Sequence, residues 1–336
     1  MFTFGLADGP MAFDPLILLL LAIVLEGIAG FARVFIQHIP SPLSVITELT
    51  LFFDRKLNRE HRSQMDRAIR GVLVTLFIIA LCLGVSAGVL WVAGHVPYGW
   101  ALELILTASL LTQRKTYDQT RTLSKYVSSG LLADARHHLE DMTGQHTANL
   151  DEHAICRTSI ETITETFVTG VVAPVFWFIL FGFPGILILR AMNAMSRKID
   201  KPTDRYRAFG LTAGRLNDAL LFIPARLASL LLAIGAAFAP TTHPGQAMRT
   251  MGRDAGKYPS INFGWPLAAM AGALTLTLAG PRPGQPEHAV TPWIGDGTAR
   301  ATPQDTNRAL YVYGVACLIN LAGIAAFAVI RYGSPA

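Results

Sequence analysis

Long apolar runs alternate with short polar stretches along this chain and determine its expected architecture. A helix needs about 20 apolar residues to cross the roughly 30 Å hydrocarbon core of a bilayer. The runs that meet or approach this length are Leu16–Ile36, Gly71–Ala93, Val168–Leu189, Ala219–Ala239 and Leu310–Ile330. The pattern predicts an all-α integral membrane protein with four to six transmembrane helices.

Two further apolar segments leave the number of spans open. Trp100–Leu111 is short and contains Glu103, which favours a buried or interfacial helix over a span. Phe263–Ala279 contains the helix breakers Pro266 and Gly272, so we expect a broken or re-entrant helix there.

A polar region, Gln113–Glu165, separates the second and third clear spans. Its apolar residues recur every four positions, which predicts an amphipathic helical insertion. A second helix is expected to begin near Asn149, with Glu152 completing a capping box, and to run to about Phe167. The recurring apolar residues are Leu123, Val127, Leu131, Ala135 and Leu139.

Composition and charge agree with a membrane protein. Of the 336 residues 51% are hydrophobic and 15% charged, against about 25% charged in soluble domains. The net charge of +5 is scattered and does not indicate a nucleic-acid partner.

Lys and Arg concentrate in Arg55–Arg70 and Arg190–Arg226, which the positive-inside rule places in the cytoplasm. We expect a multi-pass protein of the cell (inner) membrane.

Paired carboxylates form the first candidate site. Arg157, Glu161 and Glu165 fall at i, i+4 and i+8 on one helix face. Two carboxylates one turn apart can share a divalent cation or hold one proton between them. The alternative is a solvated helix face on which Arg157 pairs with Glu161.

Basic and amide residues form two more clusters. The first follows the third span and suits either lipid headgroups or a phosphate ligand; its members are Arg190, Asn193, Arg197, Lys198, Lys201, Arg205 and Arg207. The second surrounds the start of the fourth span and consists of Arg215, Asn217, Asp218 and Arg226. Pro224 lies inside this span, so we expect a kink and a freed backbone carbonyl.

The last cluster combines polar residues with helix breakers. Its members are Ser260, Asn262, Gly264, Trp265 and Pro266, and a simple turn would also explain them.

The three cysteines lack the spacing of a metal site, and adjacent His137 and His138 would point apart on a helix. No P-loop, GxGxxG or GxSxG motif is present, and we expect no bound redox cofactor.

Taken in order, several stretches resemble one family. They are Glu161-Thr-Ile-Thr-Glu165, Gly170-Val-Val-Ala-Pro174, Gly182-Phe-Pro184-Gly185, Asn193, Arg205-Tyr206, Ile223-Pro224-Ala225-Arg226 and Ser260-Ile-Asn262-Phe-Gly264-Trp265-Pro266. Their order over about residues 16–280 resembles the CobD or CbiB membrane family of cobalamin biosynthesis, the adenosylcobinamide-phosphate synthases. The expected organisation is one polytopic membrane domain over 1–336, with a loop over 280–308 and a C-terminal transmembrane helix over 310–330.

The resemblance implies an integral membrane amide ligase. With ATP and Mg²⁺ it would join aminopropanol or its phosphate to adenosylcobyric acid, giving adenosylcobinamide (phosphate). The implied partners are the corrinoid substrate, the lipid bilayer and other membrane proteins of the pathway. The implied catalytic residues are Arg226, Asp218 and Asn262, the substrate-binding residues are Asn193, Tyr206, Arg215 and Ser260, and the metal ligands are Glu161 and Glu165.

The chain departs from the family pattern at several positions. Where the family carries acids, an arginine or a Gly-Asp-Pro motif, this chain has Gln145-His146, Thr166, Thr169, Ser196, Asn217, Leu267 and Gly30-Phe31-Ala32. Fewer carboxylates leave less negative charge to hold Mg²⁺. A second hypothesis therefore stands beside the ligase, namely a diverged non-catalytic membrane partner or regulator of the same fold.

Overall fold

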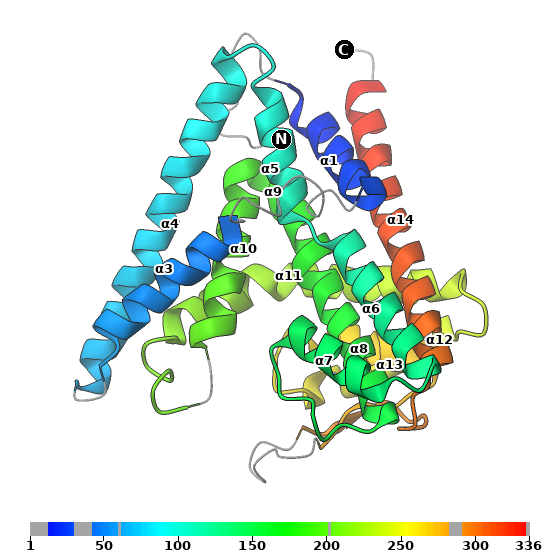
Figure 1. Cartoon of the computed structure of the whole chain (residues 1–336). Helices are drawn as coiled ribbons and strands as arrows, with labels where there is room; N and C mark the ends of the chain where they lie inside the picture. The colour runs from blue at the N-terminus through cyan, green and yellow to red at the C-terminus, as the bar shows by residue number, and fades with distance from the viewer. Residues whose placement is uncertain (1–12, 30–41, 60–61, 201–202, 282–290, 334–336) are drawn as a thin grey trace. The chain divides into compact units, whose positions relative to one another are not determined.

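The computed structural model describes residues 13–29, 42–59, 62–200, 203–281 and 291–333. Within these residues the chain is almost entirely helical, with one two-stranded ribbon (Figure 1). It divides into two compact units, one over 1–111 and 173–221 and the other over 112–172 and 222–336. Each unit is described by itself below.

The first unit is built from helices on both sides of its insertion point. They are α1 (Pro15–Ala29), α3 (Pro42–Leu57), α4 (Gln64–His95), α5 (Trp100–Leu110), α9 (Ala173–Phe181) and α10 (Phe183–Ile199). Helix α11 (Leu211–Ala237) begins in this unit and ends in the second. Helix α10 packs against α3, α4, α5 and α9, so it forms the centre of the unit.

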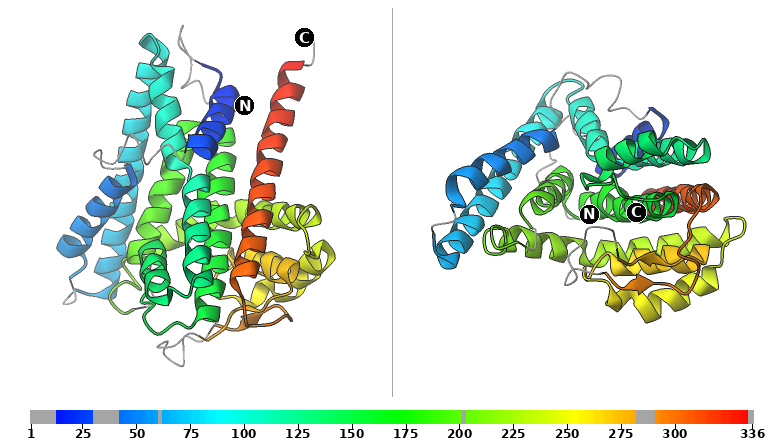
Figure 2. Two further views of the ribbon diagram at one scale, coloured as in Figure 1. Left: turned by 45° about the vertical axis from the view of Figure 1, so that its right-hand side comes forward. Right: turned by 60° about the horizontal axis from the view of Figure 1, so that its bottom comes forward.

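The second unit contains the amphipathic insertion and the C-terminal part of the chain. Its elements are α6 (Gln113–Ser128), α7 (Leu132–Thr143), α8 (Glu152–Phe167), the π-helical turn η1 (Val168–Val172), α12 (Pro244–Asp254), the 3-10 turn η2 (Ala255–Lys257), α13 (Gly264–Leu274), β1 (Leu278–Ala279), β2 (Trp293–Ile294) and α14 (Pro303–Gly333). Helices α12 and α13 lie side by side, as both views in Figure 2 show in yellow to orange.

Four helices are long and apolar enough to cross a membrane: Gln64–His95, Glu152–Phe181, Leu211–Ala237 and Pro303–Arg331. The prediction of an all-α fold with membrane-spanning helices is thereby confirmed. The run expected over Leu16–Ile36 is described only to Ala29, as the short helix α1, and its remainder lies outside the described residues.

The boundaries of the third span were predicted wrongly. The helix does not start afresh near Val168, because α8, η1 and α9 continue as one helical segment from Glu152 to Phe181. It ends at Gly182, which has a φ of 69°, and Pro184 opens α10. The predicted cap at Asn149 is also wrong, since the Oδ1 atom of Asp151 accepts the Ala154 N–H at 2.7 Å.

The chain at Thr112 passes close to the π-helical turn η1 at Gly170. The Thr112 N–H donates to the Gly170 carbonyl at 3.1 Å, and a Cβ atom at Gly170 would overlap the Thr112 hydroxyl. A larger residue at position 170 would therefore force the Thr112 side chain to move. Close packing continues in this unit where the rings of Phe167 and Tyr313 meet edge to face at 5.5 Å and the Tyr313 hydroxyl donates to the Gln113 carbonyl.

The four-residue periodicity of the insertion runs through two helices. Gly130, with a φ of 74°, separates α6 from α7. Leu123 and Leu139 are fully buried, whereas Leu131 at the turn is 49% exposed. The predicted amphipathic character is correct, but a helical hairpin and not one uniform face produces it.

Neither ambiguous apolar segment is long enough to span a bilayer as described. Helix α5 has 11 residues, with Glu103 buried, and α13 also has 11 residues. Beyond α13 the chain turns at Thr275 and forms β1, which pairs antiparallel with β2. The prediction of a loop over 280–308 is wrong in two places. Within this range Trp293–Ile294 form β2, and α14 begins at Pro303 instead of near residue 310.

Candidate functional site

Arg226 on α11 has a fixed and half-buried side chain. One of its terminal nitrogens donates to the Phe222 carbonyl at 2.6 Å and to the Oδ1 atom of Asn262 at 3.3 Å. Its guanidinium carbon lies 3.6 Å from the centre of the Phe222 ring and 5.2 Å from that of Trp265. Stacking and hydrogen bonds together orient the guanidinium plane.

The loop before α13 presents Asn262 to this arginine. Asn262 is fully buried. The backbone N–H groups of Asn262 and Phe263 both donate to the Ser260 hydroxyl at 3.4 Å, which is a local turn stabilised by serine. Gly264 follows because a Cβ atom there would collide with the Ala255 carbonyl. The loop is therefore a simple turn, as one of the two predictions had it, and it also contacts Arg226. The structure brings Ser260, Asn262 and Arg226 together.

Pro224 frees a carbonyl as expected, and the structure shows its new partner. A proline at position 224 has no N–H for the carbonyl of residue 220, four positions earlier. The indole N–H of Trp177 donates to the Leu220 carbonyl at 2.8 Å. A side chain of α9 therefore replaces the helical hydrogen bond that α11 lacks.

The paired glutamates on α8 are half-buried. The Oε1 atom of Glu161 accepts the Ala279 N–H of strand β1 at 2.8 Å, and Ala279 has the positive φ of 60°. Arg157, one turn earlier, donates to the Ala299 carbonyl at 2.5 Å. It also lies 5.5 Å from the ring centre of Trp293. This face of α8 thus contacts the ribbon segment and is not simply solvated.

The donor set limits what kind of metal the pair can hold. Among the described residues no group of three or more His, Cys, Asp or Glu side chains could hold a metal ion. Magnesium that accompanies a nucleotide is commonly held by one or two carboxylates plus phosphate oxygens. A carboxylate has about four lone-pair sites, so Glu161 can accept the Ala279 bond and still bind a cation. Two carboxylates one turn apart are thus the kind of ligand that a Mg²⁺ ion takes when phosphate oxygens supply its other ligands.

The remaining predicted residues lie in the first unit. Asn193 on α10 is buried, Asp218 on α11 is half-buried, and Arg215 is exposed. Asp218 interacts electrostatically with both Asp200 and Arg215. Sequence reasoning missed Asp200, a carboxylate one turn after Ser196 whose Oδ2 atom accepts the Ser196 hydroxyl at 3.2 Å.

Tyr206 is held by a residue that sequence reasoning also missed. Its hydroxyl lies 3.4 Å from the Oδ2 atom of Asp54 in α3, which also pairs with Arg205 at 3.0 Å. Asp54 is 3% exposed. An acidic residue within the amphipathic run of α3 is the signal that could have identified it.

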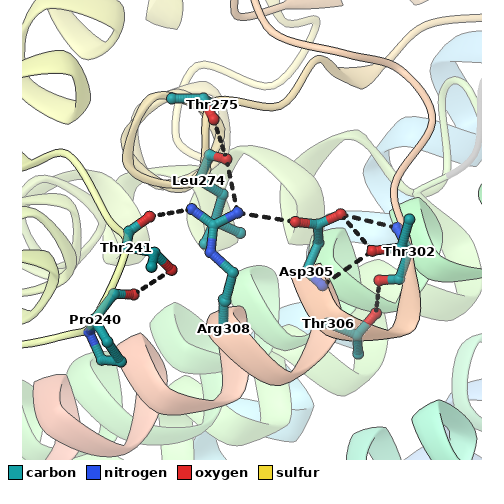
Figure 3. Close-up of polar contacts among 8 residues, drawn as sticks. All are labelled: Pro240, Thr241, Leu274, Thr275, Thr302, Asp305, Thr306 and Arg308. Atoms are coloured by element: carbon teal, nitrogen blue, oxygen red, sulfur yellow. Dashed lines mark hydrogen bonds and ion pairs between the residues drawn. The ribbon is translucent and has the colours of Figure 1, made fainter.

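A guanidinium at the start of α14 joins three segments of the second unit (Figure 3). Arg308 pairs with Asp305 at 2.9 Å and donates to the Leu274 carbonyl at 3.3 Å and to the Thr241 carbonyl. Leu274 is the last residue of α13, and both Thr241 and Thr275 have positive φ. Arg308 thus donates to the carbonyl of the last residue of α13 and to the carbonyl of Thr241, a residue in the left-handed region. We therefore assign this arginine a structural role.

Asp254 at the end of α12 is a second buried anchor. It is 1% exposed in its side chain, pairs with Arg253 at 2.7 Å and with Lys257 at 2.6 Å, and accepts the Gly295 N–H at 2.9 Å. The hydrogen bonds from Arg253, then those from Lys257 and Gly295, hold the pKa of Asp254 well below its ordinary range. This carboxylate fixes the segment after β2 against α12.

The fold defines a helical membrane protein with four candidate spans, in which hydrogen bonds and ion pairs between segments hold the buried polar side chains. A sequence model of the CobD/Cbib protein family matches residues 19–313. The chain belongs to this family.

Similar proteins cover nearly its whole length. A cobalamin biosynthesis protein CobD from a Sinorhizobium species is 35% identical, over 94% of this chain and 98% of that protein. Proteins with the same description from Klebsiella pneumoniae and Rhodobacter capsulatus are 33% and 32% identical, over 85% and 88% of this chain and 90% and 92% of their own lengths. No solved structure matches the chain.

Proposed function

We propose that this member of a cobalamin-biosynthesis family is an ATP-dependent amide ligase. It joins aminopropanol or its phosphate to a carboxyl group of adenosylcobyric acid, giving adenosylcobinamide or its phosphate. The observation that carries the proposal is the orientation of Arg226 by Phe222, Asn262 and Trp265. A preoriented guanidinium stabilises the negative charge that develops on a transferring phosphoryl group.

The proposed reaction has two steps. A carboxylate oxygen of the corrinoid attacks the γ-phosphorus of ATP, and ADP leaves with the electrons of the broken P–O bond. The amine nitrogen then attacks the acyl carbon, the C–O bond to phosphate breaks, and the nitrogen loses a proton. Arg226 holds the phosphoryl oxygens through both steps, and Asn262 keeps the guanidinium in place.

Carboxylates of the chain bind the cation of the nucleotide in this proposal. Glu161 and Glu165 on α8 are the proposed ligands, and Asp218 on α11 is proposed separately as a catalytic residue. When bound, Mg²⁺ neutralises phosphate charge and polarises the P–O bond. Asn193, Tyr206, Arg215 and Ser260 are proposed to bind substrate.

The proposed location is the cell (inner) membrane. The four candidate spans support a multi-pass arrangement. The basic segments Arg55–Arg70 and Arg190–Arg215 face the cytoplasm in this proposal, where ATP is available. Other membrane proteins of the pathway remain the proposed protein partners.

Complementation of a strain that lacks its own synthase tests the function. Glu165→Gln keeps the size of the side chain and its hydrogen bonding but removes one charge. We expect wild type to restore corrinoid-dependent growth and Glu165→Gln to lower turnover by roughly 10²–10³, as expected for one lost charged contact in the transition state. Glu152→Gln is the matched control, because Glu152 is exposed on the same helix.

The outcomes separate the two hypotheses. Failure of the wild type at normal membrane abundance would favour the non-catalytic partner over the ligase. Equal growth of wild type and Glu165→Gln would show that the glutamate pair is not part of the site.

A further inference from the structure

The chain between β2 and α14 runs along one face of α8. His153, Arg157 and Glu161 lie on this face, at i, i+4 and i+8. The Nδ1 atom of His153 is 2.9 Å from the Ala301 carbonyl oxygen, and Arg157 donates to the Ala299 carbonyl at 2.5 Å. The segment that leads from β2 to α14 is therefore attached to α8 at two successive turns.

The two-stranded ribbon contacts the same face of α8. The Oε1 atom of Glu161 accepts the Ala279 N–H at 2.8 Å, and Ala279 pairs with Trp293 across β1 and β2. The guanidinium carbon of Arg157 lies 5.5 Å from the centre of the Trp293 ring. These contacts leave α8 at Arg157, pass through the ribbon and return to α8 one turn later at Glu161.

The end of β1 is held in an unfavourable conformation. Ala279 and Gly280 have φ values of 60° and 79°. A residue with a side chain is uncommon in the left-handed region, and such strain persists only where neighbouring contacts maintain it. The Trp293 ring packs so closely on Gly280 that a Cβ atom there would collide with it. The packing of Trp293 thus helps to keep the Ala279 N–H directed at Glu161.

This bond restricts a side chain that otherwise has several rotamers. Ordering a long side chain costs free energy, and a ligand that is already ordered avoids that cost when it binds. A carboxylate has about four lone-pair sites, so one hydrogen bond does not exhaust them. Glu165 lies one turn further along α8. The ribbon therefore fixes the first carboxylate of the pair relative to the second.

We propose that Arg157 and Trp293 are positioning residues that hold the Glu161 carboxylate ready for a divalent cation. They act through the Ala279 N–H and are not ligands themselves. The inference rests on the proposed function, because it concerns the cation that the glutamate pair is proposed to bind. Since linkage is reciprocal, binding of the cation must in turn stabilise the ribbon on α8.

Binding of Mn²⁺ to the purified full-length protein in detergent provides the first test. The ion is added with a non-hydrolysable ATP analogue and followed by electron paramagnetic resonance. Trp293→Leu leaves every charge unchanged, and we expect it to weaken Mn²⁺ binding about threefold to tenfold, the equivalent of ordering one long side chain. Trp91→Leu, the same change at an exposed tryptophan of α4, is the matched control and should leave binding unchanged.

The Glu161→Gln background separates positioning from a general loss of structure. Glutamine keeps an oxygen that accepts the Ala279 N–H but lacks the charge, so it should weaken Mn²⁺ binding at least about tenfold. In this background Trp293→Leu should change the remaining binding by less than about 1.5-fold, because the residue acts through the Glu161 carboxylate. A general structural role would weaken binding equally in both backgrounds.

Hydrogen exchange measures the reciprocal effect without reference to activity. Mn²⁺ with the ATP analogue should slow exchange of the β1 amides in wild type about threefold to tenfold. Glu161→Gln should abolish this slowing.

Each outcome bears on the inference separately from the ligase reaction. Unchanged Mn²⁺ binding in Trp293→Leu, or equal weakening in the Glu161→Gln background, would overturn the inference and leave the ligase standing. Equal binding by wild type and Glu161→Gln would overturn it together with the proposed cation site. The expected coupling in a protein that fails complementation would refute the ligase and support the positioning role. If Trp293→Leu fails to fold, Arg157→Lys decides, because it keeps the charge but loses the planar guanidinium.

Discussion

The hydrogen bond from Trp177 to the Leu220 carbonyl should stabilise the protein by a measurable amount. Trp177→Phe keeps an aromatic ring beside Phe176 and Phe181 but removes the only N–H of the indole. The Leu220 carbonyl, already deprived of its helical donor by Pro224, would then lose the partner that lies 2.8 Å away. We therefore expect Trp177→Phe to lower the free energy of unfolding.

The magnitude follows from the burial of the bond. A fully buried polar group that loses its partner costs about 1–3 kcal/mol, and this half-buried bond should cost about 1–1.5 kcal/mol. The smaller ring adds roughly 0.5–1 kcal/mol of lost apolar contact. The total expected loss is about 2 kcal/mol.

A double-mutant cycle with Pro224→Ala isolates the hydrogen bond. Alanine at position 224 restores a backbone N–H that can reach the Leu220 carbonyl, so Trp177→Phe should cost only the ring term in that background. The expected coupling energy is about 1 kcal/mol. Equilibrium unfolding of the four proteins in mixed detergent micelles, followed by circular dichroism, measures it. A coupling energy within about 0.3 kcal/mol of zero would refute the assignment of Trp177 as the substitute donor.

Two further results are expected. Because the pKa of Asp254 is lowered in the folded state, its contribution to stability is fully present above pH about 4 and is lost as the pH falls below that value. The difference in unfolding free energy between wild type and Asp254→Asn, about 1–3 kcal/mol at pH 7, should therefore shrink below pH 4. Asp296→Asn, a change at an exposed carboxylate that also pairs with Arg253, is the matched control. Cysteines placed at Lys56 or Lys198 should resist an impermeant reagent added outside intact cells, and rapid labelling of either would contradict the proposed cytoplasmic side.

The apolar runs alone predicted the class of fold. A run of apolar residues as long as Gly71–Ala93 has one stable arrangement in a bilayer, a helix that satisfies its own backbone, so no tertiary information was needed. The freed carbonyl followed equally from Pro224, because the missing N–H is a property of the residue itself. The family resemblance also came from the order of short motifs and was confirmed by the comparisons.

Helix boundaries and partners required the tertiary structure. The periodicity around Leu131 is the same in one helix or in two, so only the positive φ at Gly130 shows the hairpin. Nothing in the sequence near Val168 reveals that α8 and α9 continue through a π-helical turn, since the close approach of Thr112 to Gly170 involves residues far apart in the chain.

For the candidate site too, the sequence identified the residues and the tertiary structure identified their partners. Sequence pattern identified Arg226, Asn262 and Tyr206 as residues that need explanation. It could not identify Asp54 as the acceptor for Tyr206 or Trp177 as the donor for Leu220, because each pair joins segments more than 40 positions apart. Residue types and their local spacing are written in the sequence, whereas the partner of a buried polar group depends on which distant segment packs against it.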